Sequence, residues 1–241
     1  MKIIPPLLPA VFQSRYKRFF CDVIDQNQSG LTIHCPNTGS MKGCLVPQSN
    51  CWYSLANNPK RKLPGTLEIV TTVNGNMAGI NTSRANHLVR EAIEADLVPE
   101  LCGYQQIYSE VKYGAENSRI DLLLDDPVKG CCYVEVKNVT MEKTHGLVAF
   151  PDAVTTRGTK HLRELMAMVK QGHRAVLFFC VQVTGASKME VAADIDPNYA
   201  KTLIEALAVG VEVMAWRVKL APDEIYLQKS IPFQDLQVPE T

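Results

Sequence analysis

The stretch that most constrains the fold is residues 131–140, an apolar, β-branched run that contains Glu135 and Lys137. Such residues favour strands, and side chains two positions apart in a strand point to the same face of the sheet. Glu135 and Lys137 are therefore expected to share a face. A second strand-like run at 118–124 precedes it and carries Asp121 among apolar side chains. We expect the two runs to be neighbouring strands.

A three-stranded meander is predicted from the loop lengths in this region. The strand candidates are 108–113, 118–124 and 132–139, and the connections at 114–117 and 126–130 have hairpin lengths. Paired residues in a hairpin have a constant sum of residue numbers, so Glu110 would face Asp121, and Asp121 would face Glu135. The next row of the sheet would contain Lys112, Arg119 and Lys137.

The predicted row of acids requires a counter-charge, because like charges opposite each other in a sheet are destabilising and raise one another's pKa. A divalent cation is one solution, and carboxylate oxygens suit Mg²⁺ or Mn²⁺. The neighbouring cations are the other solution, which would make the face a solvated ion-pair ladder. A slip or bulge of one residue would remove the alignment altogether.

The front third of the chain is basic, although the whole chain has no net charge. Residues 1–80 hold eight Lys and Arg against three Asp and Glu, and the remainder holds 17 against 22. Five short strands separated by polar turns predict a small barrel of the OB-fold type. Cations interleaved with aromatics suit nucleic-acid binding, and the candidates are Arg15, Tyr16, Lys17, Arg18, Lys60, Arg61 and Lys62. Alternatively, the aromatics belong to the barrel core and the cations to a solvated face.

Helical patterns flank the central strands. A helix over 85–95 has a buried stripe of Ala85, Leu88, Val89 and Ala92, and Glu91 borders it. A second helix ends near residue 169, with Arg157 and His161 off its apolar stripe, where they can contact a phosphate backbone or the carboxylates. A buried strand at 174–183, a helix over 197–209 and strands at 211–220 and 225–229 complete a mixed α/β sheet.

Composition limits the cellular setting. No apolar run is long enough to span a bilayer, and residues 1–6 lack a signal-peptide pattern, so we expect a cytoplasmic protein and no membrane partner. The cysteines form no Cys-x-x-Cys pair or zinc-ligand spacing, which predicts reduced, packed thiols. The sequence leaves a homodimer open.

Several motifs together resemble two known groups of proteins. Asp121 followed by Glu135-Val136-Lys137 resembles the PD-(D/E)XK nuclease core, with Ile120 in place of the usual Pro. The segments at 15–19, 35–41, 109–114 and 150–158 resemble the sugar fermentation stimulation protein A (SfsA) family. This resemblance covers nearly the whole chain.

The resemblance implies an OB-fold-like nucleic-acid-binding domain at 1–82 and a PD-(D/E)XK nuclease-like α/β domain at 83–241. It implies DNA binding without strong sequence specificity. Asp121 and Glu135 map onto the metal ligands, together with the Val136 carbonyl, and Lys137 onto the catalytic lysine. Glu110 and Glu91 are further metal-ligand candidates, and Arg119, Arg157 and His161 are further DNA-binding candidates.

Three functions follow as hypotheses. The first is a Mg²⁺- or Mn²⁺-dependent phosphodiesterase acting on DNA. The second is a DNA-binding regulator that retains the nuclease fold but does not cleave DNA. The resemblance implies that it would regulate maltose metabolism. The third is a small-molecule enzyme of sugar metabolism, which is disfavoured because the chain has no glycine-rich phosphate-binding loop.

Overall fold

The N-terminal part of the chain forms a closed β-barrel in the computed structural model, which describes residues 1–56, 58 and 60–234. Its strands are β1 (Leu8–Tyr16), β2 (Phe20–Asp25), β3 (Gly30–His34), β4 (Asn50–Leu55), β5 (Gly65–Thr71) and β6 (Met77–Gly79). They run in the order β3-β2-β1-β4-β5-β6, and a pairing of β3 with β5 closes the barrel. Phe12, Ile33 and Leu67 fill its interior. The predicted OB-fold-like barrel is confirmed, and this part of the chain has six strands where the sequence predicts five.

The C-terminal part is built on a six-stranded mixed sheet with the order β15-β14-β12-β9-β8-β7. Its strands are β7 (Gln106–Tyr113), β8 (Ser118–Asp126), β9 (Gly130–Val139), β12 (Arg174–Val181), β14 (Glu212–Leu220) and β15 (Ile225–Ser230). The central strands β9, β12 and β14 are parallel, and the outer pairings are antiparallel. Every residue from Ala175 to Val181 is buried, which confirms the predicted central strand.

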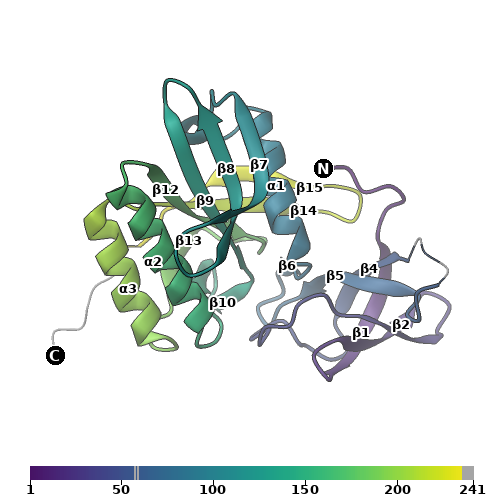
Figure 1. The fold of residues 1–241 in the computed structure, drawn as a ribbon. Coiled ribbons are helices and arrows are strands. Elements are labelled where there is room, and N and C mark those ends of the chain that lie inside the picture. The colour runs from purple at the N-terminus through teal and green to yellow at the C-terminus, as the bar shows by residue number, and fades with distance from the viewer. Residues whose placement is uncertain (57, 59, 235–241) are drawn as a thin grey trace.

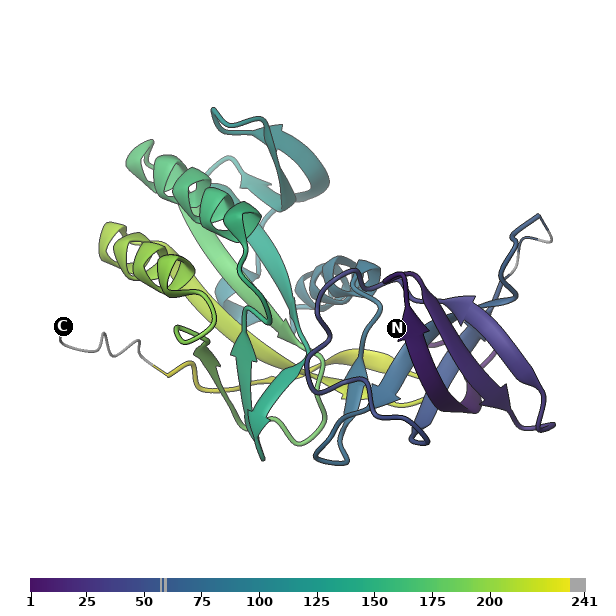
Figure 2. The same ribbon diagram turned by 90° about the horizontal axis from the view of Figure 1, so that it is seen from below.

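Helices cover both faces of this sheet (Figures 1 and 2). Helix α1 (Ser83–Glu94) packs its apolar stripe on one face, against side chains such as Val134 and Val176. Helices α2 (Thr156–Lys170) and α3 (Pro197–Val209) lie side by side on the other face, over Leu177 and Phe179. A 3-10 helix, η1 (Pro99–Leu101), follows α1.

Local sequence explains where the helices begin and end. The Thr155 hydroxyl accepts from the Gly158 N–H at the start of α2, and the Asp196 carboxylate accepts from the Tyr199 N–H at the start of α3. Gly210 adopts the left-handed conformation that terminates α3, with φ of 108°. Pro197 occupies the first turn of α3, where its missing N–H leaves no hydrogen bond unmade.

A second, three-stranded sheet was not predicted. It consists of β10 (Met141–Thr144), β11 (Leu147–Phe150) and β13 (Lys188–Val191), in the order β10-β11-β13. Residues 142–146 form the end of β10 and a tight turn. The sheet has no local sequence signal because β11 takes β13, about forty residues further along the chain, as its parallel partner.

The barrel and the α/β part share buried surface. One continuous cluster of buried side chains includes Phe12 and Ile33 of the barrel together with Leu162 and Leu203 of the helices. Strand β6 also forms a bridge from Ala78 to Val183. The division at residues 82 and 83 stays a prediction, and it falls between β6 and α1. None of the helices in the described residues is long and apolar enough to cross a bilayer.

Candidate active site

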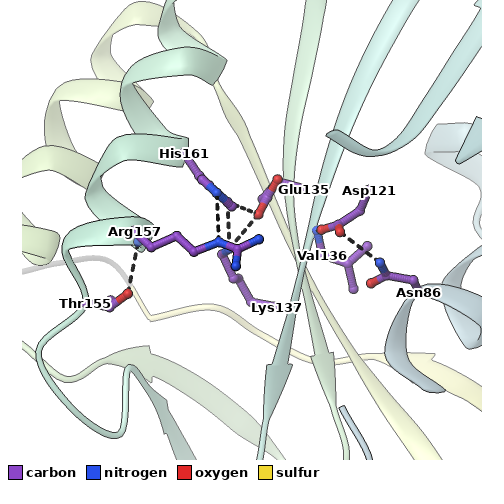
Figure 3. Close-up of polar contacts among 9 residues, drawn as sticks. Asn86, Asp121, Glu135, Val136, Lys137, Thr155, Arg157 and His161 are labelled. Atoms are coloured by element: carbon purple, nitrogen blue, oxygen red, sulfur yellow. Dashed lines mark hydrogen bonds and ion pairs between the residues drawn. The ribbon is translucent and has the colours of Figure 1, made fainter. Parts of the chain in front are cut away.

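Glu135 lies in the middle of β9 and is 1% exposed, facing α2. Its Oε1 atom is 2.6 Å from Lys137 Nζ and also contacts His161 Nδ1 (Figure 3). Its Oε2 atom is buried and has no hydrogen-bond partner among the described residues. Burial alone would raise the pKa of Glu135, but Lys137 and His161 outweigh it and hold that pKa below its ordinary value. Glu135 is therefore an ionised carboxylate with one uncommitted oxygen.

His161 and Arg157 lie one helical turn apart on α2, where His161 contacts the Glu135 carboxylate and Arg157 contacts His161. Lys137 Nζ lies 3.2 Å from His161 Nδ1, and Arg157 Nε lies 3.3 Å from His161 Nε2. The contacts with Glu135 and Arg157 suit the imidazole tautomer that donates from Nδ1 and accepts at Nε2, so that Lys137 donates to Glu135 and not to Nδ1. His161 is 6% exposed. Its position fixes the side chain of Glu135 and leaves the terminal nitrogens of Arg157 for other partners.

Asp121 lies on β8 and points to the other side of β9, towards α1 (Figure 3). Its Oδ1 accepts from Asn86 Nδ2 at 2.8 Å, and its Oδ2 accepts from the Val136 N–H at 2.7 Å. Burial, and secondly the negative charge of Glu135, raise the pKa of Asp121 to about 6. Asp121 and Glu135 thus interact electrostatically, and the charge of Glu135 disfavours ionisation of Asp121.

The predicted row of acids is only partly realised. The hairpin registers are as expected: Ser109 pairs with Leu122, and Leu122 with Val134. However, the β8–β9 ladder ends at the pair Leu122–Val134, so Asp121 and Glu135 are not ladder partners. Glu110 has no ladder partner and a left-handed φ of 57°, so its side chain leaves the row. The three carboxylates therefore do not form the predicted row of cross-strand pairs.

The wider set of predicted metal ligands is not assembled. No group of three or more His, Cys, Asp and Glu side chains in residues 1–56, 58 and 60–234 has an arrangement that could hold a metal. Glu91 pairs with the Met1 ammonium at 2.7 Å, and Glu110 lines a separate hollow. Asp121 and Glu135 are the acidic candidates that remain near each other.

A cleft of about 410 Å³ opens over Asp121 and Lys137, between the two parts of the chain. The barrel loop at 36–41 forms one wall through Asn37, Thr38 and Gly39. The other walls come from the start of α1, from β8 and β9, and from Asp152 and Arg157. An acid, an ammonium and a guanidinium therefore face one cavity.

The barrel loop is held over this cleft by contacts with distant segments. The Arg15 guanidinium donates to the backbone carbonyls of Arg18, Asn37 and Gly39 at 2.7–3.2 Å. From the other side, Asp152 Oδ2 accepts from Ser40 Oγ at 2.8 Å and from the Met41 N–H at 3.0 Å. Arg15, a predicted DNA-binding residue, is thus placed where it positions a wall of the cleft.

The remaining predicted DNA-binding residues lie in three places. Lys17 and Arg18 form a left-handed turn between β1 and β2, beside Tyr16, which stacks on Phe20 and is 40% exposed. The basic loop of Lys60, Arg61 and Lys62 is exposed and contributes nothing to the cleft lining. Arg119, Arg157 and His161 line a hollow beside α2.

The sequence reasoning missed Asn86 and Asp152. Asn86 borders the apolar stripe of α1, as Glu91 does, and only the acid was chosen because carboxylates are common metal ligands. Asp152 lies in a segment that carried the family resemblance, as does its partner loop at 36–41. That both segments carry the resemblance was the available indication that they contact each other.

Comparisons with known proteins agree with this architecture. A model of the sugar fermentation stimulation protein RE domain matches residues 83–224, and a model of the SfsA N-terminal OB domain matches residues 14–80. The chain belongs to the sugar fermentation stimulation protein (SfsA) family. The resemblance noted in the sequence is thereby confirmed, as is the fold class.

Similar proteins match over nearly their full length. A sugar fermentation stimulation protein homolog of Teredinibacter turnerae is 56% identical over 228 residues, covering 95% of this chain and 97% of the relative. The homolog of Shewanella loihica is 53% identical over 232 residues, covering 96% and 99%. The solved structure of Pyrococcus furiosus SfsA in complex with Ca²⁺ is 27% identical, covers 98% of both chains and superposes with a TM-score of 0.86.

Proposed function

We propose that this protein is a divalent-metal-dependent phosphodiesterase that acts on DNA without strong sequence specificity. The observation that carries the proposal is the cleft that the half-buried Asp121 and Lys137 both line, with Glu135 paired to Lys137 at 2.6 Å. Cleavage of a phosphodiester needs oxygen ligands for a metal and a cation near the reacting phosphate. These are the groups that the cleft offers.

The donor set fits a hard divalent cation such as Mg²⁺ or Mn²⁺. Asp121 and Glu135 supply carboxylate oxygens, and we assign the backbone carbonyl of Val136 as a third ligand. Glu135 Oε2 is buried without a partner among the described residues, which is costly unless a cation or a donor occupies the position. The raised pKa of Asp121 likewise reflects carboxylate charge that a cation would compensate. The Ca²⁺ complex of Pyrococcus furiosus SfsA supports a divalent cation in this fold.

The protein's own side chains have separable roles. A bound divalent cation would polarise the phosphate and lower the pKa of an attacking water. Lys137, which is held by Glu135 and lines the cleft, places a positive charge where negative charge develops on the phosphate oxygens. Asn86 and the Val136 N–H orient Asp121, and His161 orients Glu135.

One observation favours a second candidate, a DNA-binding regulator without cleavage activity. The Lys137 ammonium already pairs with Glu135 and His161 contacts the same oxygen, so the buried charge is compensated without any divalent cation. In this case the cleft and the basic surfaces would bind phosphates only, and affinity would fall steeply with salt.

A cleavage assay distinguishes the two candidates. Labelled single-stranded and duplex DNA would be incubated with Mg²⁺, Mn²⁺ or EDTA and with wild-type protein, Asp121→Asn or Glu135→Gln. We expect metal-dependent products from the wild type and a loss of at least about 100-fold in both variants, with DNA binding retained. The matched controls are the exposed Asp223→Asn and Glu205→Gln, which should cleave as the wild type does.

Two results would contradict the phosphodiesterase. Equal cleavage by wild type and both site variants would place the activity elsewhere or in a contaminant. Salt-sensitive binding by the wild type, without product under any metal, would establish the second candidate instead.

A further inference from the structure

A second hollow, of about 490 Å³, lies beside the cleft and between the β7–β8 hairpin and α2. Lys112, Ser118 and Arg119 line it from the hairpin, and Arg157 and Lys160 line it from the helix. We call it the hairpin pocket. Arg157 also lines the cleft over Asp121, so the two cavities share one wall. Glu110 is the single acid among the lining residues.

The charge of the hairpin pocket is unusual for a purely structural surface. Lys112 and Arg119 are direct cross-strand partners on β7 and β8. Like charges placed directly opposite each other destabilise a sheet. In the part of the chain that the structure describes, neither side chain forms an ion pair or a hydrogen bond, although several exposed Arg and Lys residues elsewhere do, such as Arg163 with Glu116. The two cations are therefore free to neutralise an anion.

A buried hydroxyl provides an independent indication of a ligand. Ser118 is 4% exposed, lines the hairpin pocket, and its Oγ atom is buried without a hydrogen-bond partner among the described residues. Buried polar groups normally have partners, because an unmade hydrogen bond costs free energy. An oxygen acceptor in the hairpin pocket would satisfy this hydroxyl, and phosphate oxygens are such acceptors.

The surrounding structure holds the pocket in shape. Glu164 of α2 is 2% exposed and accepts from the backbone N–H groups of Ala115 (3.1 Å) and Glu116 (2.6 Å) in the hairpin turn. Arg163 pairs with the Glu116 carboxylate, and Lys160 donates to the Glu116 carbonyl. These contacts clamp the turn to the helix, so the two walls are fixed relative to each other. A preformed site loses little entropy on binding a small anion.

We propose that the hairpin pocket binds a phosphate group of the nucleic-acid strand adjacent to the phosphate in the Asp121 cleft. Four cations against one carboxylate match a phosphate in charge, and Ser118 matches it in hydrogen bonding. The proposal rests on the proposed function for its choice of nucleic acid as the ligand. The phosphate has two sources, an internal phosphodiester or a terminal phosphate monoester, and the experiment separates them.

Binding without metal tests the pocket independently of cleavage. Fluorescence anisotropy in EDTA would measure labelled single-stranded oligonucleotides ending in a 5′-phosphate, a 3′-phosphate or hydroxyls only. Lys112→Gln/Arg119→Gln should weaken binding and lower the slope of log affinity against log salt by about one. Lys201→Gln/Lys229→Gln removes the same charge from exposed positions away from the pocket and serves as the matched control.

Ser118→Ala separates a built site from general basic character. The hydroxyl has no partner among the described residues, so its removal should not lower the melting temperature but should weaken oligonucleotide binding by about three- to tenfold. Inorganic phosphate, compared with chloride at equal ionic strength, should displace oligonucleotide from the wild type and not from Lys112→Gln/Arg119→Gln.

The outcomes are distinct. A preference of the wild type for one phosphorylated end, lost in the pocket variants, identifies a terminal phosphate. An equal loss for all three oligonucleotides identifies an internal phosphate. The pocket is refuted if Lys112→Gln/Arg119→Gln behaves as the control does, or if Ser118→Ala binds as the wild type does. Failure of the phosphodiesterase would appear only in the cleavage assay.

Discussion

Replacing Asp121 with Asn is expected to stabilise the metal-free protein at pH 8 while it abolishes cleavage. Burial and the charge of Glu135 raise the pKa of Asp121 from 3.8 to about 6. A carboxyl whose pKa is raised by folding opposes folding when it is ionised. At about 1.36 kcal/mol per pH unit, the ionised Asp121 lowers the free energy of unfolding by about 3 kcal/mol.

The isosteric amide recovers most of this free energy. Asp121 accepts hydrogen bonds from Asn86 and from the Val136 N–H. An Asn side chain has only one oxygen, so one of these bonds is lost, at a cost of about 1 kcal/mol. The net gain at pH 8 is therefore about 2 kcal/mol.

The gain depends on pH in a defined direction. Between pH 3.8 and about 6 the folded protein binds more protons at Asp121 than the unfolded chain does, so wild-type stability falls as the pH rises through this window. Above about pH 6 the penalty is complete. Below pH 3.8 the carboxyl is protonated in both states, and the variant should retain only its hydrogen-bond loss.

Urea denaturation in EDTA from pH 4 to pH 8 measures this difference directly. Asp223→Asn, an exposed change of the same chemistry, is the control and should show little pH dependence relative to the wild type. Added Mg²⁺ should stabilise the wild type and not Asp121→Asn, because binding to the folded state alone adds to its stability. A variant that is less stable than the wild type at pH 8, or a difference that is constant with pH, would refute the reasoning.

Two further changes test the contacts that position the site. Glu164→Ala removes the acceptor for the Ala115 and Glu116 N–H groups and should lower the free energy of unfolding, measured by urea denaturation, by about 2–4 kcal/mol. Glu164→Gln keeps one acceptor oxygen, so its free energy of unfolding should fall by about half as much. Equal losses would contradict the clamp. Asp152→Ala removes the anchor of Ser40 and Met41 and should speed amide hydrogen exchange at residues 38–42 without changing exchange in α3; unchanged exchange at 38–42 would show that Arg15 alone holds the loop.

Much of the fold was predictable because it depends on interactions between near neighbours in sequence. Loop lengths set the β7–β8 and β8–β9 registers, which agree with the predicted pairing of Lys112 with Arg119 and of Leu122 with Val134. The helix predicted over 197–209 is α3, which the Asp196 cap and Gly210 bound locally. The apolar run in β12 is the buried centre of the sheet.

The candidate site was predictable only in its components. Strand alternation placed Glu135 and Lys137 on one face, and the structure shows them as an ion pair. The alternation did not reveal that the ladder ends before Asp121 or that Glu110 turns away with a left-handed backbone. Where a ladder ends depends on the packing of the whole sheet, and sequence periodicity does not report it.

The sequence by itself determined the strand and helix pattern, the acidic and basic residues of the site, and the family to which the chain belongs. Only the tertiary structure decided which of these residues meet. It brought the barrel loop at 36–41 to Asp152, turned Asp121 towards Asn86 of α1, and turned Glu135 towards His161 of α2. The physical reason is that periodicity, capping and loop length act over a few residues, whereas these contacts join segments that only the packing of the barrel and the helices against the sheet brings together.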